Sequence, residues 1–473
     1  MSAALLIDFG STYTKLRAVD LDSADIIGTG QGPSTVDTDV TIGMQAALDD
    51  LAARMGSLPD FAHRLASSSA AGGLAMITVG LVREMTAEAA RIAALGAGAK
   101  LTDAFAYNLT AEDTDRIAAM APDILLLAGG TDGGNFEVIL HNAKALAGCA
   151  IDCPVVVAGN RAVADQVAHI LDRGGKTVTI TGNVMPDFNI LDIEPARDEI
   201  RRIFIDRIIH AKGIDKAAAM FDKVLMPTPA AVMEGAQLLA DGTDAQDGMG
   251  DLLVVDIGGA TTDVHSVADG APSDERVIQH GLPEPYVKRT VEGDLGMRYN
   301  ARAIVEAVGV EVLADDVGLP THRVEAWVDA ISADVDRLPV DDEERVVDRA
   351  LARAAVRVAV KRHAGVVETV FTANGPVGAQ KGKDLTTVGT VIGTGGALVH
   401  SPDPGAILET ARFDDADPMS LRPRRPKLLV DQDYALYACG LLAQVAPDAA
   451  LTFGRARLHA VATEENNGQS TAA

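Results

Sequence analysis

Residues 8–15 read Asp8-Phe9-Gly10-Ser11-Thr12-Tyr13-Thr14-Lys15, and residues 256–263 read Asp256-Ile257-Gly258-Gly259-Ala260-Thr261-Thr262-Asp263. The two stretches carry Asp, Gly and Thr at the same three offsets, and each follows an apolar run and precedes a β-prone segment. Continuous apolar runs are typical of strands that are buried on both faces. We therefore predict one strand–turn–strand unit that occurs twice in a chain of 473 residues.

The side chains of both turns suit a metal-bound polyphosphate. The aspartate stands where a buried strand ends, the glycine two residues later exposes backbone N–H groups, and the hydroxyl residues add donors. Carboxylates bind Mg²⁺ through its water molecules, so we expect Asp8 and Asp256 to hold the metal, unless they only cap their turns. The expected polyphosphate contacts are Gly10, Ser11, Thr12, Tyr13 and Lys15 in the first turn and Gly258, Gly259, Ala260, Thr261 and Thr262 in the second.

A third glycine-rich turn follows a predicted strand over 388–392 and opens a helix. Glycines so closely spaced allow a flat base or a ribose to approach the backbone, and a helix N-terminus favours a nearby anion. The glycines expected to contact the nucleotide here are Gly393, Gly395 and Gly396.

The rest of the chain alternates short β-prone runs with helical patterns, which indicates a largely parallel sheet covered by helices. Predicted strands cover 4–9, 15–20, 26–30, 124–128, 154–158, 177–181, 252–257 and 264–267, and predicted helices cover 43–54, 136–146, 162–171, 197–210 and the charged region 325–360. The turn-rich residues 241–250 are the best domain boundary. We expect an N-terminal domain over 1–245, a C-terminal domain over 246–455 and a disordered tail over 456–473.

Composition narrows the class of protein. Lys and Arg number 41 and Asp and Glu number 67, a net charge of −26 that repels phosphate backbones and anionic lipid. No apolar run approaches the roughly 20 residues of a membrane helix. We therefore expect a cytoplasmic protein with no nucleic-acid partner and no membrane partner.

The three turns resemble the phosphate-1, phosphate-2 and adenosine motifs of the actin-like ATPases, in which two duplicated RNase H-like α/β domains surround a nucleotide cleft. The whole chain resembles the MutL/GlmL family of glutamate mutase (methylaspartate mutase) accessory proteins, which are unrelated to the mismatch-repair protein of that name. The resemblance covers most of residues 1–445 and runs through 6–15, 67–74, 127–135, 255–264, 291–298 and 391–398.

This resemblance implies an ATP-dependent reactivating chaperone that uses Mg²⁺ and ATP. Its implied partner is an adenosylcobalamin-dependent mutase, which loses activity when damaged cofactor stays bound. A small-molecule enzyme on the same fold is the alternative, either a kinase or an ATP-dependent hydantoinase or oxoprolinase. An actin-like filament protein is a weaker third candidate, because a strongly acidic surface disfavours close self-packing.

Two further aspartates are candidate catalytic residues. Asp263 could orient the attacking water while Lys15, at the same offset in the first turn, reaches a phosphate; the alternative for both is an ordinary ion pair. Asp132 lies in a glycine-rich loop after a predicted strand and could approach the metal or the γ-phosphate, or simply cap the following helix. Residues 67–73 are too small and flexible for an ordinary strand; they form either a hinge or partner-contact loop or a backbone segment packed closely under another element. Residues 292–296 either line the nucleotide or form a plain loop.

Overall fold

The computed structural model describes residues 2–10, 13–35, 39–68, 74–211, 222–372 and 375–461. The chain divides into two compact units. The first comprises Met1–Gly235, Gly281–Pro285 and Tyr437–Phe453, and the second comprises Ala236–His280, Tyr286–Leu436 and Gly454–Ala473. The domain limits expected from the sequence stay predictions.

The first unit begins with a five-stranded sheet in the order β10-β4-β1-β2-β3. Strands β1 (Ala3–Phe9), β2 (Tyr13–Asp20) and β3 (Asp25–Pro33) form an antiparallel meander, and β4 (Phe61–Ser68) and β10 (Lys223–Pro227) extend it in parallel. Every residue of β1 is buried, which explains its unbroken apolar run. Helix α1 (Val40–Met55) packs on β3 at glycines; a Cβ on Gly30 would lie 2.4 Å from the Ala47 carbonyl oxygen.

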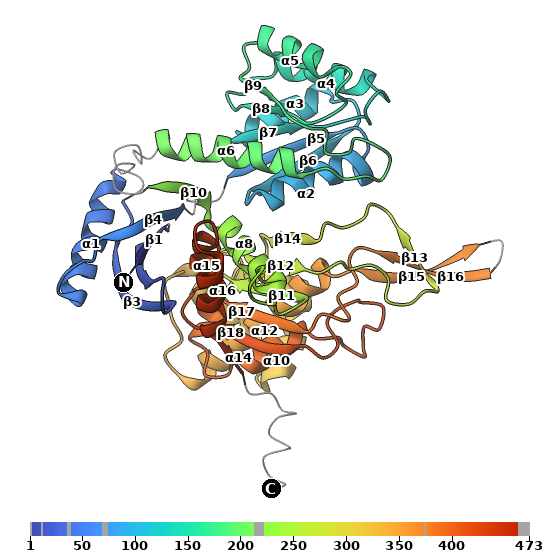
Figure 1. Ribbon diagram of the computed structural model, residues 1–473. Helices are drawn as coiled ribbons and strands as arrows, with labels where there is room; N and C mark the ends of the chain where they lie inside the picture. The colour runs from blue at the N-terminus through green and yellow to red at the C-terminus, as the bar shows by residue number, and fades with distance from the viewer. Residues whose placement is uncertain are drawn as a thin grey trace. The chain divides into compact units, whose positions relative to one another are not determined.

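A second, fully parallel sheet is inserted between β4 and β10 in the order β6-β5-β7-β8-β9. Alternating residues of its strands face opposite cores: Leu126 and Val156 pack with α2 and α6, while Leu125 and Val157 pack with α4 and α5 (Figure 1). The elements are β5 (Ala75–Gly80), a π-helical turn (Arg83–Ala87), α2 (Glu88–Gly96), β6 (Lys100–Ala106), α3 (Ala111–Met120), β7 (Ile124–Leu127), α4 (Glu137–Gly148), β8 (Val155–Val157), α5 (Ala164–Arg173), β9 (Val178–Ile180) and α6 (Glu194–Ala211).

The second unit repeats the plan of the first sheet. Its order is β14-β12-β11-β17-β18-β19, in which β11, β12 and β14 are antiparallel and β17 and β18 continue in parallel. In both units the strands thus follow the order third, second, first, fourth, fifth. The bounds are β11 (Leu252–Ile257), β12 (Thr262–Val267), β14 (Val287–Glu292), β17 (Thr390–Thr394), β18 (Lys427–Asp431) and β19 (Leu458–Ala460).

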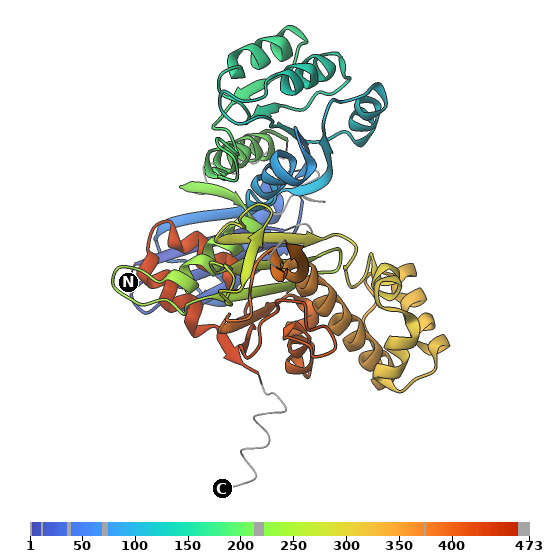
Figure 2. The same cartoon turned by 90° about the vertical axis from the view of Figure 1, so that its right-hand side faces the viewer.

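Helices cover this sheet, and a small three-stranded sheet accompanies it. Figure 2 shows α9, α10 and α11, in yellow, gathered beside α12, and contacts among all four helices support this grouping. The helices are α9 (Ala301–Val308), α10 (Val310–Val317), α11 (Thr321–Ala333), α12 (Asp342–His363), α13 (Gly396–Val399) and α14 (Pro404–Leu408); the small sheet has β13 (Val277–His280), β16 (Gly375–Lys381) and β15 (Val366–Thr372). Further helices of the described residues are α8 (Thr228–Asp241), α15 (Leu436–Ala443), α16 (Pro447–Ala456) and a 3-10 turn (Glu409–Ala411).

The structure confirms the predicted strands and helices of the first half and corrects three expectations. The helical region predicted over 325–360 is two helices, α11 and α12, because the intervening segment contains Pro339. The expected tail from residue 456 starts too early, since β19 pairs with β18. Ser67 and Ser68 are buried at the end of strand β4, contrary to prediction, and residues 69–73 of that stretch lie outside the described residues. Among the described residues, no helix is long and apolar enough to cross a membrane.

Candidate functional site

Asp8 is the penultimate residue of β1 and is only 8% exposed. Its Oδ1 accepts hydrogen bonds from Ser67 Oγ at 3.2 Å and from Thr228 Oγ1 at 2.8 Å, because β4 and β10 run parallel to β1 and end at the same edge. Burial raises the pKa of this carboxyl above its ordinary value, against the opposing effects of Thr228, Lys15 and Ser67. Asp8 is therefore a buried carboxyl held in place by hydroxyl donors at the end of the sheet.

The first turn reverses at Gly10. Its N–H donates to the Tyr13 carbonyl oxygen at 3.0 Å, and a Cβ there would lie 2.6 Å from that oxygen. Tyr13 is 47% exposed, and Lys15 is the cross-strand partner of Asp8. Ser11 and Thr12, expected to contact phosphate, lie outside the described residues.

Asp256 occupies the equivalent place at the end of β11, but its surroundings are more acidic. Burial, together with the carboxylates of Asp263 and Asp431, raises the pKa of Asp256 to about 7, against the opposing charge of Arg289. Asp263 is its cross-strand partner on β12, and Asp431 ends β18. Within the described residues no three His, Cys, Asp or Glu side chains converge to hold a metal ion directly, so Mg²⁺ at Asp256 stays a prediction.

Asp263 is ion-paired with Arg289 of β14 at 2.9 Å, and both side chains are largely buried. The carboxylate's other oxygen, Oδ1, is buried and has no hydrogen-bond partner among the described residues. The ion pair that was the alternative interpretation of Asp263 is thus present, and Oδ1 of Asp263 can still accept a hydrogen bond from another donor. A role in orienting water stays a prediction.

The second turn, Gly258–Thr262, rests on the segment after β14. Backbone N–H groups of Met297 and Arg298 donate to the Gly258 and Gly259 carbonyl oxygens at 3.1 and 2.9 Å. Thr262 Oγ1 donates to the Leu295 carbonyl oxygen at 2.7 Å, so its hydroxyl is used inside the protein. Ala260 is exposed and Thr261 partly exposed. The segment expected to line the nucleotide therefore packs directly on the turn.

The third turn packs against the second from the other side. Gly395 has φ of +96°, and a Cβ there would lie 2.3 Å from the Ile257 carbonyl oxygen and 2.9 Å from Asp256 Oδ1. Gly393 must be small because a Cβ would lie 2.7 Å from Leu398 Cδ1 in the core. Gly396 begins α13 and is exposed. Residues predicted independently from two distant turns thus meet within the second unit.

A cavity of about 470 Å³ opens beside these turns, wholly within the second unit. It is large enough for a drug-sized ligand. Its walls come from the second turn, the segment after β14, α12 and the third turn, through Ile257, Gly258, Gly259, Met297, Arg298, Leu338, Pro339, Arg345, Val346, Asp348, Arg349, Ala352, Gly396, Ala397, His400, Ser401, Pro402 and Ile407. The α12 residues of this wall were missed by the sequence analysis, because a helical charge pattern does not distinguish a cavity wall from a solvated face.

Asp132 lies in the inserted sheet, where it joins the loops after β7, β8 and β9. Its Oδ1 accepts from the Arg161 N–H at 3.0 Å and from Asn183 Nδ2 at 2.9 Å, and its own N–H donates to the Pro186 carbonyl oxygen. These hydrogen bonds give the Asp132 carboxylate a structural role in holding the loops together. A role at the metal or γ-phosphate stays a prediction.

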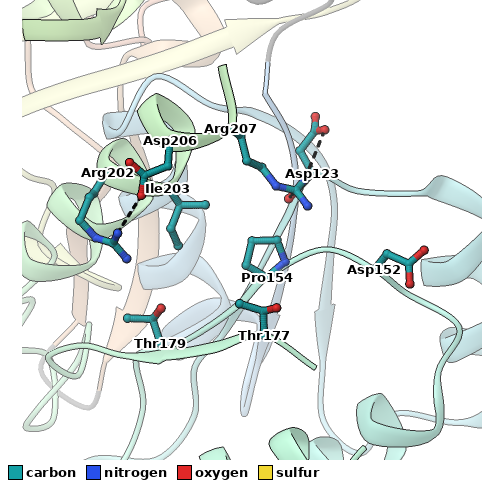
Figure 3. A pocket seen from close by; sticks show the side chains of 9 residues that line it. All are labelled: Asp123, Asp152, Pro154, Thr177, Thr179, Arg202, Ile203, Asp206 and Arg207. Carbon is teal, nitrogen blue, oxygen red and sulfur yellow. Dashed lines mark hydrogen bonds and ion pairs between the residues drawn. The ribbon is translucent and has the colours of Figure 1, made fainter. Parts of the chain in front are cut away.

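A second cavity of about 720 Å³ lies at the amino ends of β7, β8 and β9, beside α6 (Figure 3). Its two arginines already have partners: Arg207 Nη1 donates to the Asp123 carbonyl oxygen at 2.6 Å, and Arg202 Nη1 pairs with Asp206 at 2.9 Å. Asp152 adds another negative charge. With its cations neutralised, this cavity is poorly suited to a polyphosphate.

The duplicated strand order and the aspartate turn that ends the first strand of each sheet define the actin-like ATPase fold, with two RNase H-like sheets. The sequence profile of the family described as MutL protein matches residues 4–458, and this chain belongs to that family. Protein MutL of Clostridium tetanomorphum is 50% identical over 452 residues, which cover 95% of this chain and 98% of that protein.

Solved structures resemble the chain only distantly. The activator of the 2-hydroxyisocaproyl-CoA dehydratase from Clostridium difficile, with bound ADPNP, is 11% identical with a TM-score of 0.29 and covers 100% of this chain and 98% of its own. The ligand-bound xylulose kinase from Lactobacillus acidophilus is 10% identical with a TM-score of 0.36, covering 100% and 96%.

Proposed function

We propose that the chain is an ATPase that binds Mg-ATP and uses its hydrolysis to remodel a partner enzyme. The observation that carries the proposal is the cavity of the second unit, around which the second and third turns meet at Asp256 and Gly395. The first turn places a second carboxylate, that of Asp8, near the end of an equivalent strand.

The proposal gives each residue a role in binding. Phosphate contacts are assigned to the first turn (Gly10, Ser11, Thr12, Tyr13) and to the second (Gly258, Gly259, Ala260, Thr261, Thr262), with Lys15 as a further cation. The N–H groups of Gly10 and Gly258 donate to the Tyr13 and Thr261 carbonyl oxygens, so other N–H groups of the turns would take the phosphate oxygens. Gly393, Gly395 and Gly396 leave room for the nucleoside. Asp8 and Asp256 accept hydrogen bonds from the water molecules of Mg²⁺, which neutralises charge on the polyphosphate.

Two residues are proposed to act on the attacking water. The free Oδ1 of Asp263 is suited to accept a proton from that water, while Arg289 holds the other carboxylate oxygen in a fixed orientation. For Asp132, a position near the γ-phosphate remains a prediction from the sequence. Its hydrogen bonds in the structure are with the loops of the inserted sheet.

The proposed partner is an adenosylcobalamin-dependent mutase whose damaged cofactor must be released. Such a task needs two arrangements of the protein that ATP and ADP stabilise to different extents, because a ligand with equal affinity for both shifts nothing. The partner must also prefer one arrangement. Membership of the MutL family supports this proposal, since the resemblance stated above implies the same role.

The test has two parts. A mutase encoded beside this chain is inactivated by turnover, and its activity is then followed after addition of this protein, Mg-ATP and fresh cofactor. We expect recovery with ATP and none with a non-hydrolysable analogue. Failure to recover any candidate mutase, together with ATP-dependent conversion of a small molecule by this chain alone, would favour the kinase or hydantoinase alternative.

A further inference from the structure

The inserted sheet of the first unit has a topology that is typical of binding proteins. Its strands follow the order second, first, third, fourth, fifth, so the order reverses between β5 and β7 (Figure 1). Doubly wound sheets of this kind bind ligands outside the carboxyl ends of their strands, next to the point of reversal. The loops that follow β5, β6, β7, β8 and β9 are therefore the part of this sheet best placed for binding.

The glycine-rich loop after β7 uses its backbone inside the protein. The Asp132 N–H group donates to the Pro186 carbonyl oxygen at 2.9 Å. The Gly133 N–H group donates to Asn160 Oδ1 at 3.0 Å. An anion needs successive N–H groups that are not already bonded, so this loop is poorly suited to a phosphate. The same bonds join the loops after β7, β8 and β9 into one framework.

This framework presents large apolar side chains to solvent. Phe136, at the start of α4, is 50% exposed, and Phe188 and Ile190, in the turn directly after Pro186, are 65% and 55% exposed. The loop after β6 adds Tyr107, which is 55% exposed. The chain has only ten Phe and six Tyr, so three exposed rings among the loops at one end of one sheet are unexpected. Exposed apolar side chains that gather in this way mark binding surfaces.

Tyr107 is held in a backbone conformation that bulky residues avoid, with φ of +68°. Its N–H donates to the Leu81 carbonyl oxygen at 3.2 Å, and its carbonyl oxygen accepts from Asn142 Nδ2 at 2.9 Å. These bonds tie the loop after β6 to the loop after β5 and to α4. Such strain collects at functional sites, and here it accompanies an aromatic side chain that stays exposed.

The composition of this surface fits another protein. Exposed asparagines accompany the apolar side chains at positions 108, 135 and 189. Rigid aromatic side chains among asparagines and glycines are characteristic of loops that bind proteins. The exposed charged residues of the same loops carry both signs, as the polar rim of an interface does; they are Arg83, Glu84, Arg161, Asp187 and Asp192. A second copy of the chain fits less well, because two molecules of net charge −26 repel each other.

We infer that the carboxyl edge of the inserted sheet is the docking surface for the partner enzyme, with Phe136, Phe188 and Ile190 as its apolar contacts. This step rests on the proposed function and adds the surface that the partner covers. The matching surface of the partner is apolar at its centre and carries hydrogen-bonding groups for the asparagines. Because the loops are already fixed by hydrogen bonds, little order has to be gained on binding.

The experiment measures the dissociation constant between the full chain and the mutase encoded beside it. A variant that carries both Phe136→Ser and Phe188→Ser should bind the mutase about 10- to 100-fold more weakly, because a few aromatic residues dominate the energy of most interfaces. Its phosphate release from Mg-ATP in the absence of the mutase should not change, since neither residue belongs to the turns or to the cavity of the second unit.

Phe371→Ser is the matched control. Phe371 is 82% exposed on β15 of the second unit, so the same substitution removes an exposed ring elsewhere and should change the constant by less than about twofold. Wild-type mutase binding by the double variant would overturn the inference and leave the proposed function intact. Loss of a dimer of this chain in sedimentation, with mutase binding unchanged, would also overturn it, because the surface would then join two copies. If the wild-type chain binds no mutase, the proposed function fails, and this inference fails with it.

Discussion

Asp8 and Asp256 end equivalent strands, yet their carboxyl groups have different neighbours. Asp8 is held by two hydroxyl donors and faces Lys15, whereas Asp256 faces two further carboxylates, Asp263 and Asp431. Burial raises the pKa of both groups, that of Asp256 to about 7. We therefore expect Asp256 to change its charge near neutral pH.

Replacing either aspartate should impair hydrolysis and preserve the fold. Asp8→Asn and Asp256→Asn keep the side-chain volume but remove the charge that orients the metal's water molecules. Loss of one well-placed electrostatic group costs about 10²–10³-fold in turnover in other enzymes. The measurement is phosphate release under saturating Mg-ATP, with Asp165→Asn, at an exposed position of α5, as the control. Wild-type turnover in both variants would mean that these residues only cap their turns.

The stability of the nucleotide-free protein should depend on pH through Asp256. The folded-state pKa is about 7 and an unfolded aspartate titrates near 4, so the folded state binds the extra proton between these values. Stability contributed by that proton is present below pH 4 and is lost as pH rises toward 7. Asp256→Asn removes the titrating carboxyl group, so the variant should not lose this stability as pH rises.

Chemical unfolding in the presence of a chelator tests the sign of this pH dependence. The free energy of unfolding of Asp256→Asn, relative to wild type, should increase by about 1–3 kcal/mol from pH 4 to pH 8. Asp294→Asn should show almost no such trend over this range, because the hydrogen bond from Arg362 lowers the pKa of Asp294 and its contribution to stability is lost only as pH falls below about 4. A difference between wild type and Asp256→Asn that does not vary with pH would show that Asp256 titrates normally.

At the scale of elements, the second unit places two turns back to back. The third turn packs on the strand end that carries Asp256, and the segment Leu295–Arg298 supports the second turn from the other side. Arg298 connects this segment to α12, because its guanidinium donates to both carboxylate oxygens of Asp348. The turns are thus fixed by neighbouring backbone, which suits a site that must hold charged groups in place.

Gly395→Ala tests the contact between the turns. Its φ of +96° and the 2.3 Å approach to the Ile257 carbonyl oxygen both exclude a side chain, so we expect a loss of about 2–4 kcal/mol in unfolding free energy and weaker nucleotide binding. Gly318→Ala is the control, since Gly318 also has positive φ but has open space around it and should cost only about 1–2 kcal/mol. Equal effects of the two substitutions would mean that the turns are not in tight contact.

At the scale of the whole molecule, the proposal requires coupling between nucleotide and partner. If ATP alters the affinity for the mutase by some factor, the mutase must alter the affinity for ATP by the same factor. Coupling energies of about 1–3 kcal/mol, or 5- to 150-fold, are usual. Two titrations, each with and without the other ligand, measure both factors.

The coupling should vanish in Asp256→Asn if the metal-bound nucleotide drives it. Trp327, the single tryptophan of the chain, offers an independent signal because its Nε1 donates to Asp348 in the wall of the cavity. Its emission should therefore change with saturation by Mg-ATP. A mutase that binds with the same affinity at every nucleotide concentration would contradict the proposal.

The sequence by itself determined the repeated strand–turn–strand unit, the glycine turn before α13 and most elements of the first half. These features are local, since alternating or continuous apolar runs and turn residues act over a few neighbouring positions. The family resemblance could also be recognised from the sequence, and the match over residues 4–458 confirms it. The duplicated fold followed from the repeat of Asp8–Lys15 as Asp256–Asp263.

Only the tertiary structure decided which side chains surround each aspartate. Ser67 and Thr228 reach Asp8 from 59 and 220 residues away, and Asp431 reaches the neighbourhood of Asp256 from the end of β18. Likewise, the wall containing Arg349 exists because α12 lies near two turns that are distant in the chain. These neighbours depend on strand order and on parallel register, which bring the carboxyl ends of separate strands to one edge and leave no trace in local residue patterns.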